Sequence, residues 1–515
     1  MSGKCYIGPD LQGPTTLKET CDVCIIGSGA GGAVLAAGLV ERGLKVIMIE
    51  EGGYYTKDDF DLNEAHAFDK LYQDRGLRAT AELGISILQG RSVGGGTTVN
   101  WTTCFRTPDR ILKHWERVHG IEGLDSETLR PHFESVEKRL GIAEWPFESA
   151  NANNKVILDG CRKLGWDVAP LKRNVRSCAN SGYCGMGCPV SAKQAMHKTY
   201  IQDALEAGLL LFADTRVKRI ETKNNRVVAI HAQALDRESG KETGAKLIVE
   251  PKVAVSSCGA INGPALLLRS GINPNGRVGK RTMLHPVVGL PGIYDKPIRG
   301  FYGAPQSISS HQFVDRGEGK AGFFIEASPV HPVIGTFAFS GFGAAQRDFM
   351  ATLAHNAVVL GLTIDGLLPE DDGGTVSLRA DGRIHVDYPI RPFMAETFLE
   401  AHIRLAELHL AAGAREMRTL HTEPLFIRST SDIEKLRDKS YGLLEHPIFT
   451  AHQMGGCAMG PDKETSVVGP NHQHHHIPNL FVVDGSVFPT SLGVNPSQTI
   501  YGMAHRARDF VAEAV

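Results

Sequence analysis

A glycine-rich stretch near the start of the chain has the residue types needed to hold a dinucleotide. Gly27, Gly29 and Gly32 form the pattern G-x-G-x-x-G between an apolar run and a run of small residues. In such a turn the first glycine allows a tight bend, the second lets backbone N–H groups approach a diphosphate, and the third allows helix and strand to pack closely. Glu50, 23 residues after Gly27, is placed to accept hydrogen bonds from ribose hydroxyls. NAD and FAD share this pattern, so it does not choose between them.

Three cysteines, Cys178, Cys184 and Cys188, stand in the glycine-rich stretch SCANSGYCGMGCPVSAK over residues 177–193. A disulfide would use two thiols and leave one over, and structural zinc would need a fourth ligand such as His197. Thiols that only pack in the core also remain open, because free cysteine buries readily. A cluster of three irons needs one thiolate per iron, which is the number available here. We therefore predict an iron–sulfur site, with the other three interpretations left open.

Two polar residues near the C-terminus stand beside turns. His452 precedes a glycine-rich turn in AHQMGGCAMG, and Asn495 precedes the last predicted helix in PTSLGVNPSQTI. Between them, residues 482–485 predict a buried strand that ends at an acid, Asp484.

These stretches and two others resemble the glucose–methanol–choline (GMC) family of FAD-dependent oxidoreductases. GRSVGGGTTVN at 90–100 resembles the first signature of the family, and GAINGPALLLRSG at 259–271 resembles the second. The segments HQMGGCAMG, FVVDGSVFPT and GVNP resemble the C-terminal block, with the family's step of 43 residues from His452 to Asn495. The resemblance extends from about residue 20 to the end of the chain and is loosest over residues 300–440.

The resemblance implies FAD as the cofactor and His452 and Asn495 as the catalytic residues. An imidazole has an unperturbed pKa of about 6.5, so His452 suits the removal of an alcohol proton, while Asn495 would orient the same oxygen. The flavin would accept a hydride at N5. Residues 90–104 contain no histidine, so we expect noncovalent FAD. The implied cofactor contacts are Gly27, Gly29, Ala30, Gly31, Gly32, Glu50, Arg91, Gly94, Gly95, Thr97, Thr98, Asn100, Val217, Asp484, Gly485, Asn495, Pro496 and Thr499.

The cysteine spacing also resembles that of the FAD-dependent glucose and fructose dehydrogenases of the same family, which carry a three-iron (3Fe-4S) cluster. A similar cysteine-bearing loop occurs in long-chain alcohol oxidases and their bacterial relatives. A cluster at Cys178, Cys184 and Cys188 would make the protein a dehydrogenase that passes electrons to a cytochrome, a quinone or a ferredoxin-like carrier. Without a cluster, oxygen or a quinone would have to meet the flavin directly.

The stretch at 321–343 is expected to form antiparallel sheet, with Phe337 and Phe339 on one strand face. Such a wall would suit an apolar substrate, although ordinary core strands show the same pattern. We predict oxidation of a hydrophobic primary or secondary alcohol to an aldehyde or ketone, as in the long-chain alcohol oxidases. A sugar or polyol dehydrogenase and an oxygen-using oxidase without a cluster are the alternatives, and a flavin-containing lyase is less favoured.

The elements that must position these residues alternate between strand and helix near the N-terminus. Residues 23–26 and 46–49 predict strands around a helix at 33–40, and further helices are expected at 391–413 and after Asn495. We predict an α/β protein (α+β overall) with a Rossmann-like FAD-binding domain assembled from discontinuous segments, and a substrate domain whose antiparallel sheet is flanked by helices. The predicted FAD-binding domain comprises residues 1–105, 190–290 and 440–515. The substrate-binding or cap domain comprises 106–189 and 291–439, with the cysteine loop at 177–190.

Composition narrows the class of protein further. The chain has 515 residues, 42% of them hydrophobic and 22% charged, with a formal net charge of −2. This balance argues against a nucleic-acid partner, because such proteins carry a basic excess on one face. No apolar run reaches the roughly 18 residues of a membrane span, and the first residues lack the pattern of a signal peptide. We therefore expect a cytoplasmic protein whose ten cysteines are thiols or ligands.

Overall fold

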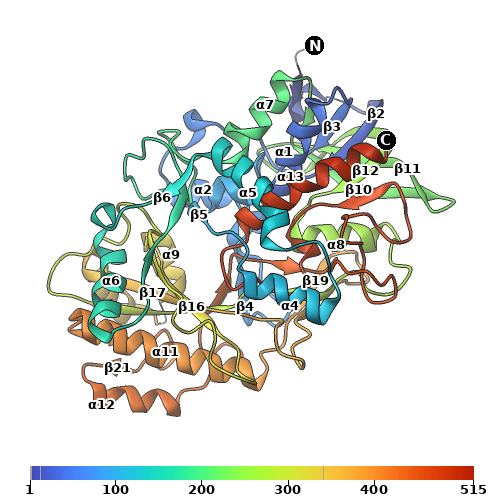
Figure 1. The fold of residues 1–515 in the computed structure, drawn as a ribbon. Helices are drawn as coiled ribbons and strands as arrows, with labels where there is room; N and C mark the ends of the chain where they lie inside the picture. The colour runs from blue at the N-terminus through green and yellow to red at the C-terminus, as the bar shows by residue number, and fades with distance from the viewer. Residues whose placement is uncertain (1–2, 12, 340) are drawn as a thin grey trace.

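A parallel sheet carries the glycine-rich turn, and it draws its strands from both ends and the middle of the chain (Figure 1). The description rests on a computed structural model and covers residues 3–11, 13–339 and 341–515. The strand order is β1-β9-β3-β2-β12-β11-β10, with β24 beside β12. Their bounds are β1 Lys4–Tyr6, β9 Leu210–Phe212, β3 Val46–Ile49, β2 Thr16–Ile26, β12 Glu242–Ser256, β11 Arg226–Leu235, β10 Thr215–Lys223 and β24 Leu480–Val482.

Strands β2, β3, β9, β12 and β24 pair in parallel, while β10 and β11 form an antiparallel ribbon. Helix α1 (Ala30–Val40) covers the sheet and packs against α7 (Tyr200–Glu206) and α13 (Ser497–Glu513). Strand β3 and nearly all of α1 are buried because their side chains are aliphatic or small. Strand β2, the glycine turn, α1 and β3 form the predicted βαβ unit, and the predicted fold class is confirmed.

A second sheet is antiparallel in all but one of its strand pairs and forms one wall of the candidate active site. Its order is β21-β20-β14-β17-β16-β15-β7, with β22 between β14 and β4. Helices α6 (Ala152–Leu164) and α11 (Pro392–Ala412) pack on it, and α11 ends at Gly413 as predicted. The bounds are β21 Phe426–Ile427, β20 Glu416–Arg418, β14 Val287–Ile293, β17 Asn356–Thr363, β16 Phe323–Ala327, β15 Ile308–Ser310, β7 Ala169–Pro170, β22 Ile448–Thr450 and β4 Ile85–Ile87.

Two smaller sheets and further helices connect these parts. The first sheet is β19 (Ile384–Asp387), β18 (Gly374–Leu378), β13 (Lys280–Met283) and β23 (Met454–Gly455); the second is β5 (Thr103–Cys104), β8 (Lys172–Asn174) and β6 (Ile142–Glu144). The other α-helices are α2 Glu64–Leu71, α3 Gly96–Val99, α4 Asp109–His119, α5 Ser126–Leu140, α8 Gly259–Arg269, α9 Pro332–Ala338, α10 Ala344–Met350 and α12 Thr430–Ile433. The predicted domain bounds remain a prediction, since sheet membership alone does not delimit domains.

The expected antiparallel sheet over residues 321–343 is wrong in its second half. Only β16 is a strand, and the residues after it form α9. Helix α9 begins at Pro332, and the Glu64 carboxylate of α2 accepts the N–H groups of Val333 and Ile334 at 2.8 and 3.2 Å. A carboxylate at this position satisfies orphan donors and favours the helix. Phe337 is therefore 69% exposed, and the predicted wall of Phe337 and Phe339 does not exist.

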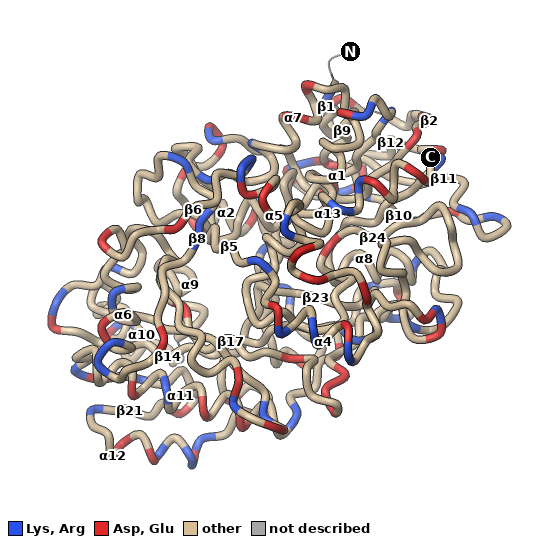
Figure 2. The backbone as a smooth tube through the Cα atoms, in the orientation of Figure 1, with Lys and Arg blue, Asp and Glu red and all other residues tan. Residues whose placement is uncertain are grey.

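Charges of both signs are interleaved along the chain, as Figure 2 shows for the backbone tube. This distribution agrees with the small net charge of −2. Among the described residues, no helix has the length and apolar character that crossing a membrane requires.

Candidate active site

A cavity of about 1100 Å³ lies between the two large sheets and brings most of the predicted site residues together. Its volume is at the upper end for small-molecule sites, so it has room for an extended ligand and a substrate. The predicted residues that line it are Gly27, Gly29, Ala30, Gly31, Glu50, Arg91, Gly95, Thr97, Asn100, Val217, His452, Asp484, Gly485, Asn495 and Pro496.

Four predicted cofactor residues do not line the cavity but pack against or bond residues near it. A Cβ on Gly32 would lie 2.1 Å from the carbonyl oxygen of Gly27, so its role is close packing. Gly94 donates its N–H to Ser28 Oγ at 3.0 Å, and Thr98 Oγ1 donates to the Val93 carbonyl at 3.1 Å. Thr499 bonds Thr107 across 2.9 Å.

The first turn of α1 meets the requirement for binding a diphosphate. Gly29 is the N-cap, and no side chain caps the helix, so its first N–H groups have no side-chain acceptor. Such groups and the helix dipole favour an anionic ligand. The backbone of a second glycine segment approaches closely, because a Cβ on Gly95 would lie 2.8 Å from Gly29 Cα. The residues present therefore fit the diphosphate of FAD.

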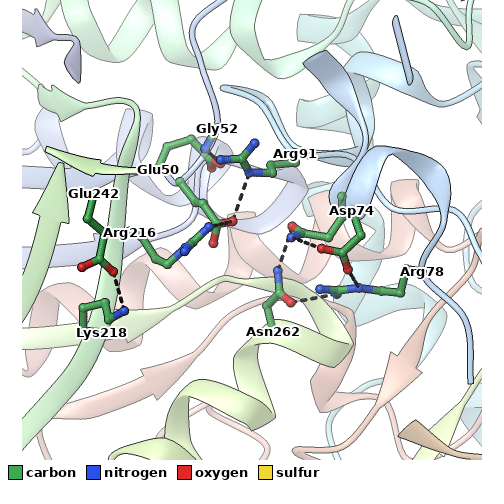
Figure 3. A network of polar contacts seen from close by, with 11 residues as sticks. Glu50, Gly52, Asp74, Arg78, Arg91, Arg216, Lys218, Glu242 and Asn262 are labelled. Atoms are coloured by element: carbon green, nitrogen blue, oxygen red, sulfur yellow. Dashed lines mark hydrogen bonds and ion pairs between the residues drawn. The ribbon is translucent and has the colours of Figure 1, made fainter. Parts of the chain in front are cut away.

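Charged and polar side chains surround the dinucleotide end of the cavity (Figure 3). Glu51 pairs with Arg91 at 3.0 Å and with Arg216 at 3.2 Å, which lowers the pKa of the Glu51 carboxyl. Glu50 accepts hydrogen bonds from Ser28 Oγ at 2.7 Å and from the Gly52 N–H at 2.8 Å. These bonds hold the Glu50 carboxylate at the end of β3, where ribose hydroxyls are expected.

A second polar group lies beside the first in Figure 3 and is fixed by one arginine. Arg78 donates to Asp74 and to Asn262, each at 2.8 Å. All three residues line the cavity. No sequence pattern indicates this group, because Arg78 and Asn262 lie 184 positions apart.

The predicted catalytic pair meets at the other end of the cavity. His452 follows β22, and Asn495 lies two residues before the start of α13. The Asn495 Nδ2 group lies 3.3 Å from His452 Nε2 and 3.2 Å from Glu326 Oε2. Burial lowers the pKa of His452 to about 4, so its imidazole is neutral at pH 7 and has a lone pair to accept a proton.

Glu326 is a buried carboxyl that the sequence analysis missed. It lies on β16 with no exposed surface, and its Oε2 also accepts a hydrogen bond from Gln306 Nε2 at 2.8 Å. Burial raises the pKa of Glu326 to about 8, which keeps it protonated at neutral pH. The one available signal was an acid inside the apolar strand FFIEA.

The raised pKa of Glu326 predicts a pH-dependent stability. Because the folded-state pKa lies above the unfolded value, its contribution is complete below pH about 4.5 and is lost as pH rises toward about 8. Glu326→Gln, which cannot ionise, should therefore gain Tm relative to the wild type between pH about 6 and about 9. Thermal unfolding of the holoenzyme at both pH values measures this gain. Glu318→Gln, at an exposed glutamate, is the control and should show no gain in Tm. If the Tm difference between Glu326→Gln and the wild type is the same at both pH values, the prediction is wrong.

The substrate side of the catalytic pair is apolar. The cavity wall there comes from the second large sheet, from α9 and from the segment after α3, and its side chains are Trp101, Val287, Ile334, Leu360, Leu362 and Phe449. This wall replaces the aromatic wall that the sequence predicted at Phe337 and Phe339.

The cysteine loop lacks support for the predicted cluster site. Among the described residues, no group of three or more histidine, cysteine or acidic side chains is placed to hold a metal ion. Arg173 Nη2 donates to Cys184 Sγ at 3.7 Å, and the Ala192 N–H donates to Cys188 Sγ at 3.3 Å. None of the ten cysteines, Cys178 included, forms a disulfide within the described part of the chain. The structure therefore does not support an iron–sulfur cluster at Cys178, Cys184 and Cys188.

The same loop supports the cavity wall. Lys193 is 3% exposed, and its Nζ donates to the carbonyls of Thr98, Asn100 and Cys184 at 2.7 to 2.8 Å. Tyr72 Oη donates to the Gly185 carbonyl at 2.7 Å. These bonds tie the backbone of the loop at Cys184 and Gly185 to the end of the glycine signature and to Tyr72, so the loop supports the cavity wall.

Comparison with known proteins agrees with this site. The GMC oxidoreductase family models match residues 68–287 (N-terminal domain) and 369–504 (C-terminal domain). The chain belongs to the GMC oxidoreductase family. It is thus an FAD-dependent oxidoreductase acting on CH–OH donors.

Individual relatives cover almost the whole chain. A long-chain-alcohol oxidase of Arabidopsis thaliana is 32% identical over 97% of this chain and 69% of its own length. An uncharacterized GMC-type oxidoreductase of Mycobacterium tuberculosis is 30% identical over 95% of this chain and 75% of its own length. The crystal structure of pyridoxine 4-oxidase from Mesorbium loti shares the fold, with a TM-score of 0.71, 19% identity, and coverage of 95% of this chain and 99% of that one.

Proposed function

We propose that the protein oxidises a hydrophobic primary or secondary alcohol to an aldehyde or ketone and returns the electrons to molecular oxygen. The observation that carries the proposal is the His452–Asn495 pair, 3.3 Å apart, at the apolar end of a cavity whose other end suits a dinucleotide. The printed names of the Arabidopsis relatives, long-chain-alcohol oxidases, support the substrate class and the acceptor.

Each residue of the pair has one task in this reaction. FAD, when bound, accepts the hydride from the carbinol carbon at its flavin N5. The alcohol hydroxyl replaces the 3.3 Å contact between Asn495 Nδ2 and His452 Nε2. His452 Nε2 accepts the hydroxyl proton, and the N–H of Asn495 released from that contact donates to the alcohol oxygen and orients the carbon. Neutral Glu326 and Gln306 hold the Asn495 amide in place without adding a buried negative charge.

The apolar wall predicts a dependence on chain length. Burying one methylene contributes about 0.8 kcal/mol, so the rate of flavin reduction at low alcohol concentration should rise about fourfold per CH2 until the wall is covered. The measurement is anaerobic bleaching of the flavin band with a series of linear alcohols, with glucose and gluconate as comparison substrates. Readmitted air should restore the band and yield hydrogen peroxide.

Other outcomes would point to the alternatives. Faster reduction by a sugar would indicate a sugar or polyol dehydrogenase, and reoxidation by a cytochrome, quinone or ferredoxin but not by oxygen would indicate a dehydrogenase. A cyanohydrin cleaved without bleaching would indicate a lyase. A cytoplasmic location belongs to the same proposal, and cell fractionation tests it.

A further inference from the structure

A second histidine, His285, contacts His452 on the side away from the cavity. His285 lies between β13 and β14 and has no exposed surface. Its Nδ1 is 3.1 Å from His452 Nδ1, and its ring lies 5.1 Å from the ring of Phe324. His285 does not line the cavity, so any effect on the substrate must pass through His452.

The hydrogen-bond pattern assigns the protons on both rings. The amide N–H of Asn495 donates to His452 Nε2, so this nitrogen is the acceptor and the ring proton stands on Nδ1. His452 Nδ1–H can then donate only to His285 Nδ1, which makes His285 Nδ1 an acceptor and places its proton on Nε2. His285 Nε2 has no hydrogen-bond partner among the described residues, so this chain of donors ends there.

The backbone at His285 is held in a conformation that few residues adopt. Its φ is 52°, in the left-handed region, which costs of order 1–3 kcal/mol for such a residue. Asp365 stabilises it by accepting the N–H groups of Leu284 at 2.8 Å and His285 at 3.1 Å. Tyr388 Oη in turn donates to Asp365 at 2.6 Å. A strained backbone conformation that surrounding hydrogen bonds hold in place is typical of functional sites.

We propose that His285 is a positioning residue that fixes His452 in the tautomer whose Nε2 lone pair faces the substrate. When His452 Nε2 takes the alcohol proton, the O–H bond breaks and an N–H bond forms. The imidazolium then donates its Nδ1–H to neutral His285, which stabilises the charge. The inference rests on the proposed function, because it requires His452 to be the base.

The surroundings of His285 keep it neutral, as this role requires. Burial, His452 and Arg110 of α4 all lower the pKa of His285 well below its usual range. Asp365, the acid that contacts it, bonds the backbone N–H rather than the ring. Glu326 of β16 is protonated at neutral pH because its pKa is raised to about 8. The neutral ring of His285 can therefore accept the hydrogen bond from His452, since neither Asp365 nor Glu326 presents a negative charge to that ring.

Two substitutions distinguish the effect of the hydrogen-bond acceptor at His285 Nδ1 from the effect of the size of the ring. His285→Asn places an amide oxygen near the position of Nδ1 and tolerates the left-handed backbone. His285→Phe keeps a ring of similar size but has no acceptor. We expect His285→Phe to lower the limiting rate of flavin reduction at least about tenfold, with the alcohol Kd within about twofold, and His285→Asn to stay within about threefold of the wild type.

The outcomes distinguish this inference from the proposed function. In a His452→Ala background, His285→Phe should cause no further loss, because its effect acts through His452. Equal rates and pH profiles for wild type and His285→Phe with full FAD content would overturn the inference alone. A rate of flavin reduction in His285→Asn as low as that in His285→Phe would also overturn the inference. Should His285→Phe fail to fold, His285→Asn and His285→Gln provide the test: both must retain activity, and a tenfold loss in His285→Asn refutes the role. An unaffected His452→Ala would instead refute the role of base that the proposed function gives to His452.

Discussion

Replacing His452 with alanine is expected to lower the rate constant for flavin reduction by alcohol at least about 100-fold, because a positioned base contributes about 10²–10⁴ in rate. FAD should stay bound, since His452 stands at the end of the cavity opposite the glycine turn of α1. Anaerobic stopped-flow bleaching of the flavin band measures the effect. Reduction at a rate close to that of the wild type would show that another group takes the proton.

His505→Ala is the matched control for this experiment. His505 lies on α13, bonds His132 at 2.9 Å and does not line the cavity, so its loss should leave flavin reduction unchanged. The pH profile gives a second check. With a pKa of about 4 for His452, caused by burial, the wild-type rate should hold from neutral pH to about 5 and fall as pH approaches about 4. A fall centred near pH 6.5 would indicate a solvated imidazole instead.

The glycine turn, α1 and β3 could be predicted because their pattern is local. A buried strand, three spaced glycines and a small-residue helix fix a βαβ unit within thirty residues. The helices α11 and α13 were predicted for the same reason, since periodicity and a terminal Gly413 suffice. The pair His452 and Asn495 was predicted to be catalytic through motif resemblance, because their spacing along the chain does not by itself show that the two side chains meet.

The errors and omissions come from contacts between distant parts of the chain. Helix α9 depends on the Glu64 carboxylate about 270 positions away, which no local pattern reveals. Glu326 reaches Asn495 across 169 positions, and His285 reaches His452 across 167. The cysteine spacing predicted a metal site, but among the described residues the fold places no group of side chains to hold a metal ion, and spacing along the chain does not show how the three thiols lie in space.

Replacing Gly31 with alanine should prevent the formation of a folded flavoprotein. A Cβ at this position would lie 1.9 Å from the Val483 carbonyl oxygen and 2.9 Å from Ser257 Oγ. Val483 cannot move aside easily, because its N–H bonds the Ser256 carbonyl at 2.9 Å and its carbonyl accepts from Ser257 Oγ at 2.7 Å. We expect insoluble protein or loss of the cooperative unfolding transition, measured by soluble yield, circular dichroism and calorimetry.

Gly29→Ala separates the fold from the cofactor site. A Cβ on Gly29 would have Gly95 Cα at 3.9 Å as its nearest neighbour, so the chain has room for it. Gly29 lines the cavity, however, and a methyl group there stands where the backbone must approach the diphosphate. The apoprotein should therefore fold with wild-type circular dichroism, while its affinity for FAD falls at least about tenfold, or about 1.4 kcal/mol. Wild-type FAD affinity in Gly29→Ala would mean that the diphosphate does not bind at this turn. For the other variant, a stable Gly31→Ala protein that binds FAD would refute the close packing of α1 on Val483.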